Sequence, residues 1–182
     1  MAFVALARNK YAVVSHAIAE VAPSDLRGSF NFVGIWRMLI ATLLTCLITA
    51  MTILIHYEAI RIVHRWHRRP SWGGTRLTVI AGVFFLFAAH SLEIWLFAAG
   101  IFIAKNVLQL GGLEGAFTET SADYLYISVV TYASVGYGDI RPTGFIRTMC
   151  GFEALTGILM MAWSAAYTVS RLQQLWSQGD RP

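Results

Sequence analysis

Charged residues are scarce in this chain, and their scarcity excludes most classes of soluble protein. Only 13% of the 182 residues are charged, whereas 57% are hydrophobic. A single soluble core of this size could not bury so much apolar surface, so a soluble enzyme is excluded. Three stretches reach the roughly 20 apolar residues that cross a bilayer core of about 30 Å. We predict transmembrane helices at residues 36–60, 77–104 and 145–172.

Cysteine is also nearly absent, since the chain has only Cys46 and Cys150. Both lie inside predicted spans, and neither has the spacing of a metal-binding pair, so we interpret them as packing residues. The start of the chain lacks the uninterrupted apolar run of a signal peptide, because polar residues interrupt it at positions 8–10. For residues 1–35 we predict instead an amphipathic helix at the membrane interface.

The basic residues that do occur are concentrated between the first two predicted spans. Residues 61–76, RIVHRWHRRPSWGGTR, contain five arginines and two histidines. Nucleic-acid binding could explain such a cluster, but a short basic loop between spans is what the positive-inside rule predicts for a cytoplasmic connection. We therefore expect no nucleic-acid partner, an amino terminus outside the cell and a short cytoplasmic tail at residues 173–182. No span has arginine at every third position, so nothing indicates a voltage sensor.

The segment between the second and third spans, residues 105–144, contains the signal for a short helix followed by a glycine-containing sequence. Ser121 can cap a helix with Asp123 in its first turn, which predicts a short re-entrant helix at residues 121–133. A lone strand is disfavoured at membrane depth because its backbone polar groups would be unpaired. The helix ends just before the sequence SVGYGD at residues 134–139. The partial negative charge of its carboxyl end would attract cations.

Two glycines in SVGYGD, at positions 136 and 138, allow backbone angles that are closed to other residues. Successive peptide units can therefore turn their carbonyl oxygens to the same side. Exposed backbone is tolerated at membrane depth only where it is buried in protein or lines a watery path. A simple glycine-rich turn is the alternative, but a turn does not require this order of residues between a short helix and an apolar span.

Residues 77–172 resemble the pore module of potassium channels, whose signature is Thr-Val-Gly-Tyr-Gly-Asp after a pore helix. In that filter, backbone carbonyl oxygens select the ion by replacing its hydration shell. Residues 134–139 match the signature at five of six positions. The resemblance implies that four carbonyls and one hydroxyl replace the water shell of a potassium ion. The expected filter residues are Ser134, Val135, Gly136, Tyr137 and Gly138, of which the first four would contact the ion.

The resemblance also implies the architecture. It predicts an all-α membrane protein with three transmembrane helices, a re-entrant pore helix and a filter loop, in which four identical chains surround one pore. The pore domain would comprise an outer helix at residues 77–104, the pore helix at 121–133, the filter at 134–138 and an inner helix at 145–172. Its implied substrate is K⁺, with no organic cofactor and no small-molecule substrate. Its implied partners are identical chains and membrane lipids, in a bacterial inner membrane.

This sequence departs from the family pattern around the filter. Ser134 replaces the usual threonine, which keeps the hydroxyl but loses the methyl group that restricts the rotamer. Tyr126 and Ile127 stand where voltage-gated relatives have two tryptophans, so the familiar tryptophan partner of Asp139 is missing. We expect Tyr126, Thr131 and Asp139 to support the filter, with the partner of Asp139 left open.

Three ionisable residues lie well inside the second and third predicted spans: His90, Glu93 and Glu153. Such groups are costly in hydrocarbon and should have partners, so we expect hydrogen bonds between helices. A proton sensor at His90 is the alternative, because histidine titrates near neutral pH. Gly157, in the third span, suits either close helix packing or a gating hinge.

Four polar residues flank the basic loop without metal-site spacing, and we expect them at the wet interface. They are His56, Glu58, His64 and His67.

The function that these patterns favour is passive, potassium-selective conduction through a tetrameric pore. A weakly selective cation channel and an accessory membrane subunit that does not conduct alone are the alternatives. No Ser/His/Asp set, metal cluster or phosphate-binding loop is evident in the sequence, so we predict that the protein is not an enzyme.

Overall fold

The computed structural model describes residues 24–68 and 76–179 of the chain. Its helices are α2 (Ser24–His67), α3 (Arg76–Asn106), α4 (Ser121–Tyr132) and α5 (Ile146–Gly179), and its strands are β1 (Leu113–Gly115) and β2 (Ile140–Pro142). The three longest helices, α2, α3 and α5, are each long and apolar enough to cross a membrane. The predicted fold class, an all-α membrane protein with a short helix between the second and third spans, is confirmed, with one small sheet added.

The helices extend beyond their predicted bounds. α2 begins inside the predicted interfacial segment and continues into the predicted basic loop, and α5 continues through most of the predicted tail at residues 173–182. The helices therefore exceed the predicted segments 36–60 and 145–172 and enter the predicted loop 61–76, while the limits of the membrane spans themselves stay predictions. Proline explains the limits of α2, since Pro23 and Pro70 flank it and proline does not fit a helix interior. The predictions that concern residues 1–23, 69–75 and 180–182 lie outside the described residues.

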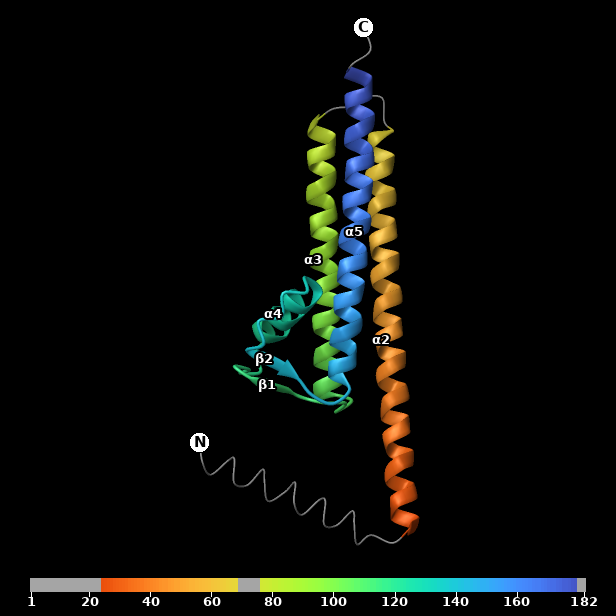
Figure 1. Cartoon of the computed structure of the whole chain (residues 1–182), viewed down its shortest axis with the longest axis vertical. Helices are drawn as coiled ribbons and strands as arrows, with labels where there is room; N and C mark the ends of the chain where they lie inside the picture. Colours follow the sequence, from red (N-terminus) through yellow and green to blue (C-terminus); the bar gives the residue numbers. More distant parts are fainter. Residues whose placement is uncertain (1–23, 69–75, 180–182) are drawn as a thin grey trace. The chain divides into compact units, whose positions relative to one another are not determined.

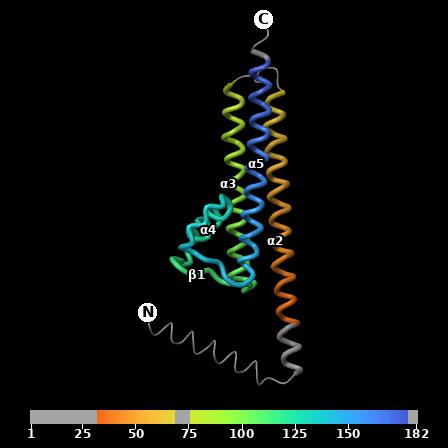
Figure 2. The backbone as a smooth tube through the Cα atoms, in the orientation of Figure 1, coloured from red at the N-terminus to blue at the C-terminus, as the bar shows by residue number. Residues whose placement is uncertain are grey.

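Contacts divide the chain into two units, residues 1–40 and 41–182. In the second unit α3 and α5 run side by side (Figures 1 and 2). Small residues let α2 approach α3: a Cβ added at Gly100 would lie 2.2 Å from the Ile48 side chain, and one at Gly82 would lie 2.8 Å from Val63. The later part of α2 is therefore packed directly against α3.

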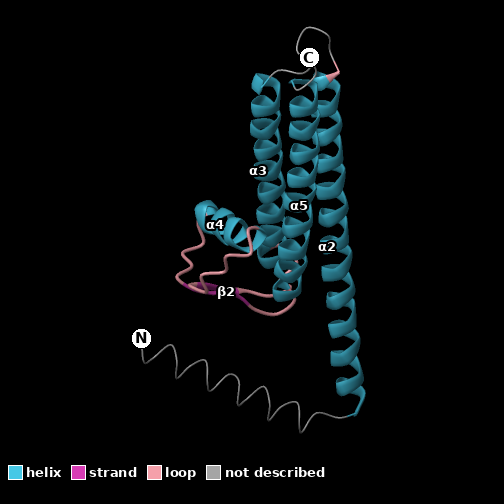
Figure 3. Ribbon diagram, turned by 45° about the horizontal axis from the view of Figure 1, so that its top comes forward, coloured by secondary structure: helices cyan, strands magenta, loops and turns pink. Residues whose placement is uncertain are grey.

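The segment between α3 and α5 forms a separate lobe on one side of the helices, in which α4 lies beside the two short strands (Figure 3). β1 pairs with β2 in antiparallel fashion, with Gly115 opposite Ile140 and Leu113 opposite Pro142. A Cβ at Gly115 would lie 2.0 Å from the carbonyl oxygen of Asp139, so only glycine allows this approach. The sheet therefore fixes the chain directly after the SVGYGD sequence.

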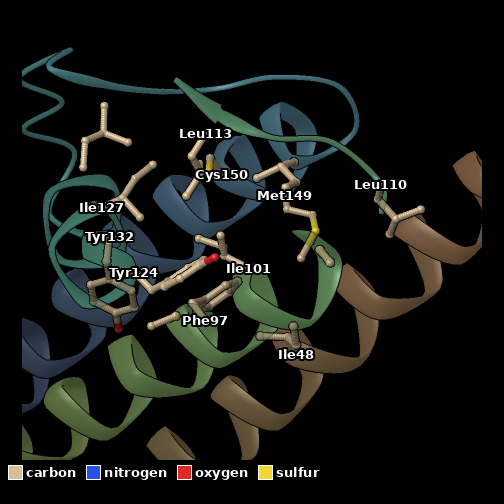
Figure 4. Close-up of a cluster of buried hydrophobic side chains, with 14 of the residues drawn as sticks. Ile48, Phe97, Ile101, Leu110, Leu113, Tyr124, Ile127, Tyr132, Met149 and Cys150 are labelled. Carbon is tan, nitrogen blue, oxygen red and sulfur yellow. The ribbon is translucent and has the colours of Figure 1, made fainter. Parts of the chain in front are cut away.

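The main buried cluster lies where this lobe meets the long helices (Figure 4). Phe97 and Ile101 of α3 pack there with Ile127 and Tyr132 of α4 and with Met149 of α5, and each is at most 2% exposed. Many apolar side chains on the outer faces of the long helices are exposed, as lipid-facing residues are. The core thus holds α4 rigidly against the spans.

Candidate functional site

α4 begins with a capping box, and its N-cap differs from the predicted one. The N-cap is Thr120 rather than Ser121; its side chain accepts a hydrogen bond from the Asp123 amide, and the Asp123 carboxylate accepts one from the Thr120 amide. A capping box needs the acidic residue three positions after the cap, which places the cap at Thr120. Thr118 donates to the same carboxylate from its hydroxyl at 2.7 Å and from its amide at 2.8 Å. These bonds, chiefly those from Thr118, lower the pKa of Asp123.

α4 ends at Tyr132, and the next amides fold back onto its last carbonyls. The Ser134 amide donates to the Thr131 carbonyl at 2.9 Å, and the amides of Val135 and Gly136 donate to the Val130 carbonyl at 2.8 and 3.1 Å. Thr131 thus supports the start of the filter through its backbone. Because the amides point toward the helix, the carbonyls of the segment are free to point elsewhere.

Residues 134–138, the filter segment, have an alternating backbone. φ is positive at Ser134 (57°), Gly136 (53°) and Gly138 (81°) but not at the two residues between them. Alternation of left-handed and ordinary conformations directs successive peptide groups to the same side. Among the described residues, nothing donates a hydrogen bond to the five carbonyl oxygens of this segment. The filter segment therefore presents a row of unpaired oxygens.

The chain directly after the filter segment is held by the side chain of Asp139. Tyr126 of α4 donates a hydrogen bond from its hydroxyl to Asp139 Oδ2 at 2.8 Å, which supplies the partner that the sequence left open. Asp139 is the main cause of a raised pKa at Tyr126. The Ala116 amide also donates to the Asp139 carbonyl at 2.9 Å. The predicted support residues thus lie at both ends of the filter segment.

α4 packs on α5 where Ser128 and Tyr132 meet Glu153 and Gly157. Glu153 is fully buried and contacts the Ser128 hydroxyl, which also donates to the Ile94 carbonyl at 2.8 Å. A Cβ at Gly157 would lie 2.1 Å from the Tyr132 carbonyl oxygen. The structure therefore favours the packing interpretation of Gly157 over the hinge.

Five buried or part-buried polar side chains from four helices form a second constellation, which we call the polar ring. It consists of His56 of α2, His90 and Glu93 of α3, Tyr132 of α4 and Ser164 of α5. The expectation that His90 and Glu93 bond between helices is met. The expectation for His56 is wrong, because its side chain is fully buried. Sequence reasoning also missed Tyr132 and Ser164, whose only signal was a polar side chain in an apolar stretch.

The ring is closed by hydrogen bonds. His56 Nδ1 lies 2.9 Å from a Glu93 oxygen, and His56 Nε2 lies 3.2 Å from the Ser164 hydroxyl. His90 Nε2 lies 3.1 Å from the same hydroxyl, and His90 Nδ1 lies 3.0 Å from the Tyr132 hydroxyl. Tyr132 donates to the second Glu93 oxygen. His90 Nδ1 also lies 3.4 Å from a Glu93 oxygen, so each of the five side chains contacts at least two others.

Two histidines and a carboxylate so close together could hold a metal ion, since their ligand-type atoms lie within 4.8 Å of one another. However, both nitrogens of each histidine and both oxygens of Glu93 already make hydrogen bonds. Each of these atoms therefore already has a neighbour at hydrogen-bond distance within the ring. His67, by contrast, is also buried but bonds only within α2, to the Val63 carbonyl at 2.7 Å. Glu58 is half exposed and pairs with Arg61, as expected at a wet interface.

Comparison with known proteins identifies the region that contains the filter segment and four of the five residues of the polar ring, since His56 lies before it. Residues 75–174 match a family model described as "Ion channel". Over 47 residues the chain is 47% identical to Protein LctB of Geobacillus stearothermophilus, a stretch that covers 26% of this chain and 35% of that protein. The match thus spans about a third of the length of this relative. No solved structure matches the chain.

Proposed function

The chain belongs to the ion channel family, and from this premise we propose that it conducts K⁺ selectively and passively through a pore made of four copies. The observation that carries the proposal is the row of unpaired carbonyl oxygens at residues 134–138. Such oxygens can replace the hydration shell of a monovalent cation. The carboxyl end of α4, which precedes them directly, adds negative potential at the same place.

The exposed side chains of the filter segment support an assembly. Val135 is 52% exposed and Tyr137 is 73% exposed in a single chain. Irregular backbone at membrane depth must be covered by protein or line a water-filled path, because lipid cannot satisfy its polar groups. Other copies of the chain are the natural cover. Four of them would surround an ion with carbonyl oxygens, with K⁺ as the transported substrate.

The orientation of the proposed channel follows from charge. The basic residues between α2 and α3 favour the cytoplasmic side. Acidic residues of the lobe, among them Asp123 and Asp139, would then face the outside, where they attract entering cations. We propose a cell membrane location with the amino terminus outside and the carboxyl terminus in the cytoplasm; a bacterial inner membrane stays a prediction.

Flux measurements on purified protein in liposomes test the proposal. A potassium gradient should drive flux, and an equal sodium gradient should drive far less. Gly136→Ala should abolish the selective flux, because alanine at a φ of 53° costs about 1–2 kcal/mol and shifts the oxygens. Gly34→Ala is the matched control, since no atom lies within 4 Å of an added Cβ there among the described residues.

Each outcome separates the proposal from its rivals. Equal potassium and sodium flux would indicate a weakly selective cation channel. No flux from well-inserted protein would indicate an accessory subunit that needs a partner channel. Selective flux that persists in Gly136→Ala would refute the assignment of residues 134–138 as the filter.

A further inference from the structure

Five hydrogen-bonded contacts close the polar ring, and each of them needs one hydrogen. A longer approach of 3.4 Å between His90 Nδ1 and Glu93 uses atoms that already belong to two of these contacts. Tyr132 and Ser164 each bring one hydroxyl hydrogen, and His56 and His90 each bring one when neutral. An ionised Glu93 brings none, so these groups supply four hydrogens for five contacts. The fifth contact is satisfied only if the ring holds one additional proton.

With that proton the ring is both complete and electrically neutral. The proton can sit on either imidazole, which leaves Glu93 ionised, or on Glu93 itself. In all three arrangements every contact of the ring has one donor and one acceptor. Without it, two lone pairs face each other and a net negative charge lies buried among the spans, which is costly.

We propose that the polar ring is a binding site for one proton, whose presence holds the carboxyl end of α4 against the surrounding helices. His56 and Glu93 are fully buried, so the proton is enclosed by protein. The ring draws its titratable groups from α2, α3 and α4, whereas α5 contributes the hydroxyl of Ser164. α5 also carries Glu153, a buried carboxyl group that contacts Ser128 of α4 rather than a side chain of the ring.

The ring is connected to the filter through Tyr132. This residue is the last of α4, its carbonyl packs on Gly157 of α5, and Ser134 follows two positions later. Loss of the proton removes one contact from the closed ring and weakens the hold on this end of α4. Alkaline conditions therefore reduce conduction, because they loosen the filter at its inner end. This step rests on the proposed function.

Glu93→Gln is the decisive variant. The glutamine amide can donate to His56 while its oxygen accepts from Tyr132, so the ring keeps one hydrogen per contact with no dissociable proton. Thermal stability and potassium flux, measured over a series of pH values, should both fall in wild-type protein as rising pH removes the proton. Glu93→Gln should lose this pH dependence while remaining folded. Ser164→Ala, which deletes two contacts, should lower stability at every pH.

The controls are two matched substitutions outside the ring. Glu153→Gln changes the other buried glutamate, and His67→Gln changes a buried histidine that bonds only within α2. Both should retain the wild-type pH dependence. A second readout is independent of flux: the ring nitrogens of His56 and His90, followed by ¹⁵N NMR, should titrate together in wild type and stay unchanged over the same pH values in Glu93→Gln.

The outcomes are distinguishable. A pH profile of stability in Glu93→Gln that equals that of wild type would overturn the proton site, as would His56 and His90 titrating at separate midpoints. Absence of potassium flux at every pH would refute the proposed function but leave the stability and NMR tests of the ring in force. If Glu153→Gln lost the pH dependence of stability and Glu93→Gln kept it, the titrating group would be Glu153, and this result would also overturn the proposal.

Discussion

Asp139 illustrates how one side chain anchors the proposed filter. The sequence showed that the usual tryptophan partner is missing, and the structure places the hydroxyl of Tyr126 at 2.8 Å from the carboxylate instead. Tyrosine can replace the indole donor here because Tyr126 and Asp139 are held in place by α4 and by the β1–β2 sheet. The Tyr126 hydroxyl thus supplies the hydrogen-bond donor to Asp139 that a tryptophan supplies in the family pattern.

Tyr126→Phe should make potassium flux decline several-fold faster under a sustained gradient, because Asp139 loses its donor and the outer end of the filter loosens. Tyr57→Phe, on the exposed face of α2, is the control. The effect should itself depend on pH. Asp139 raises the pKa of Tyr126 above its ordinary value of 10.0, so the bond is present below that value and lost as the pH rises through the raised pKa. Equal decay in Tyr126→Phe and wild type at neutral pH would contradict this role.

At the scale of elements, α4 is defined by its two ends. Its first turn is fixed by the Thr120 and Asp123 capping box, which the sequence predicted to within one residue. Its last residue is fixed by contacts with α3 and α5, which are distant in sequence. The short helix was therefore predictable, whereas the direction in which it delivers the filter segment was not.

Gly157→Ala should destabilise the contact between α4 and α5. The added methyl would lie 2.1 Å from the Tyr132 carbonyl, and such overpacking costs about 1–3 kcal/mol, more than the roughly 1 kcal/mol that alanine gains over glycine in a helix. We expect a lower unfolding temperature together with reduced flux. A gating hinge would instead predict altered flux at unchanged stability. Gly34→Ala, which meets no neighbour among the described residues, should not lower the unfolding temperature.

At the scale of the whole molecule, the proposed pore requires four chains. Chemical cross-linking in membranes should give a ladder that ends at four times the chain mass of 20.2 kDa. Tyr137→Ala should reduce the tetramer fraction, because this 73% exposed side chain needs a protein neighbour. Phe84→Ala removes an equally exposed ring on α3 and should leave assembly unchanged. A ladder that ends at two would refute the pore.

The sequence by itself determined the class of the protein and its three long apolar helices, and it predicted the filter segment, because apolar length and glycine spacing are local properties of the chain. Proline positions even explain where α2 stops. Only the tertiary structure decided the polar ring, the donor to Asp139 and the packing of Gly157. Each of these joins residues from different helices, such as His56 and Ser164, and no local pattern records which side chains meet once apolar helices pack together.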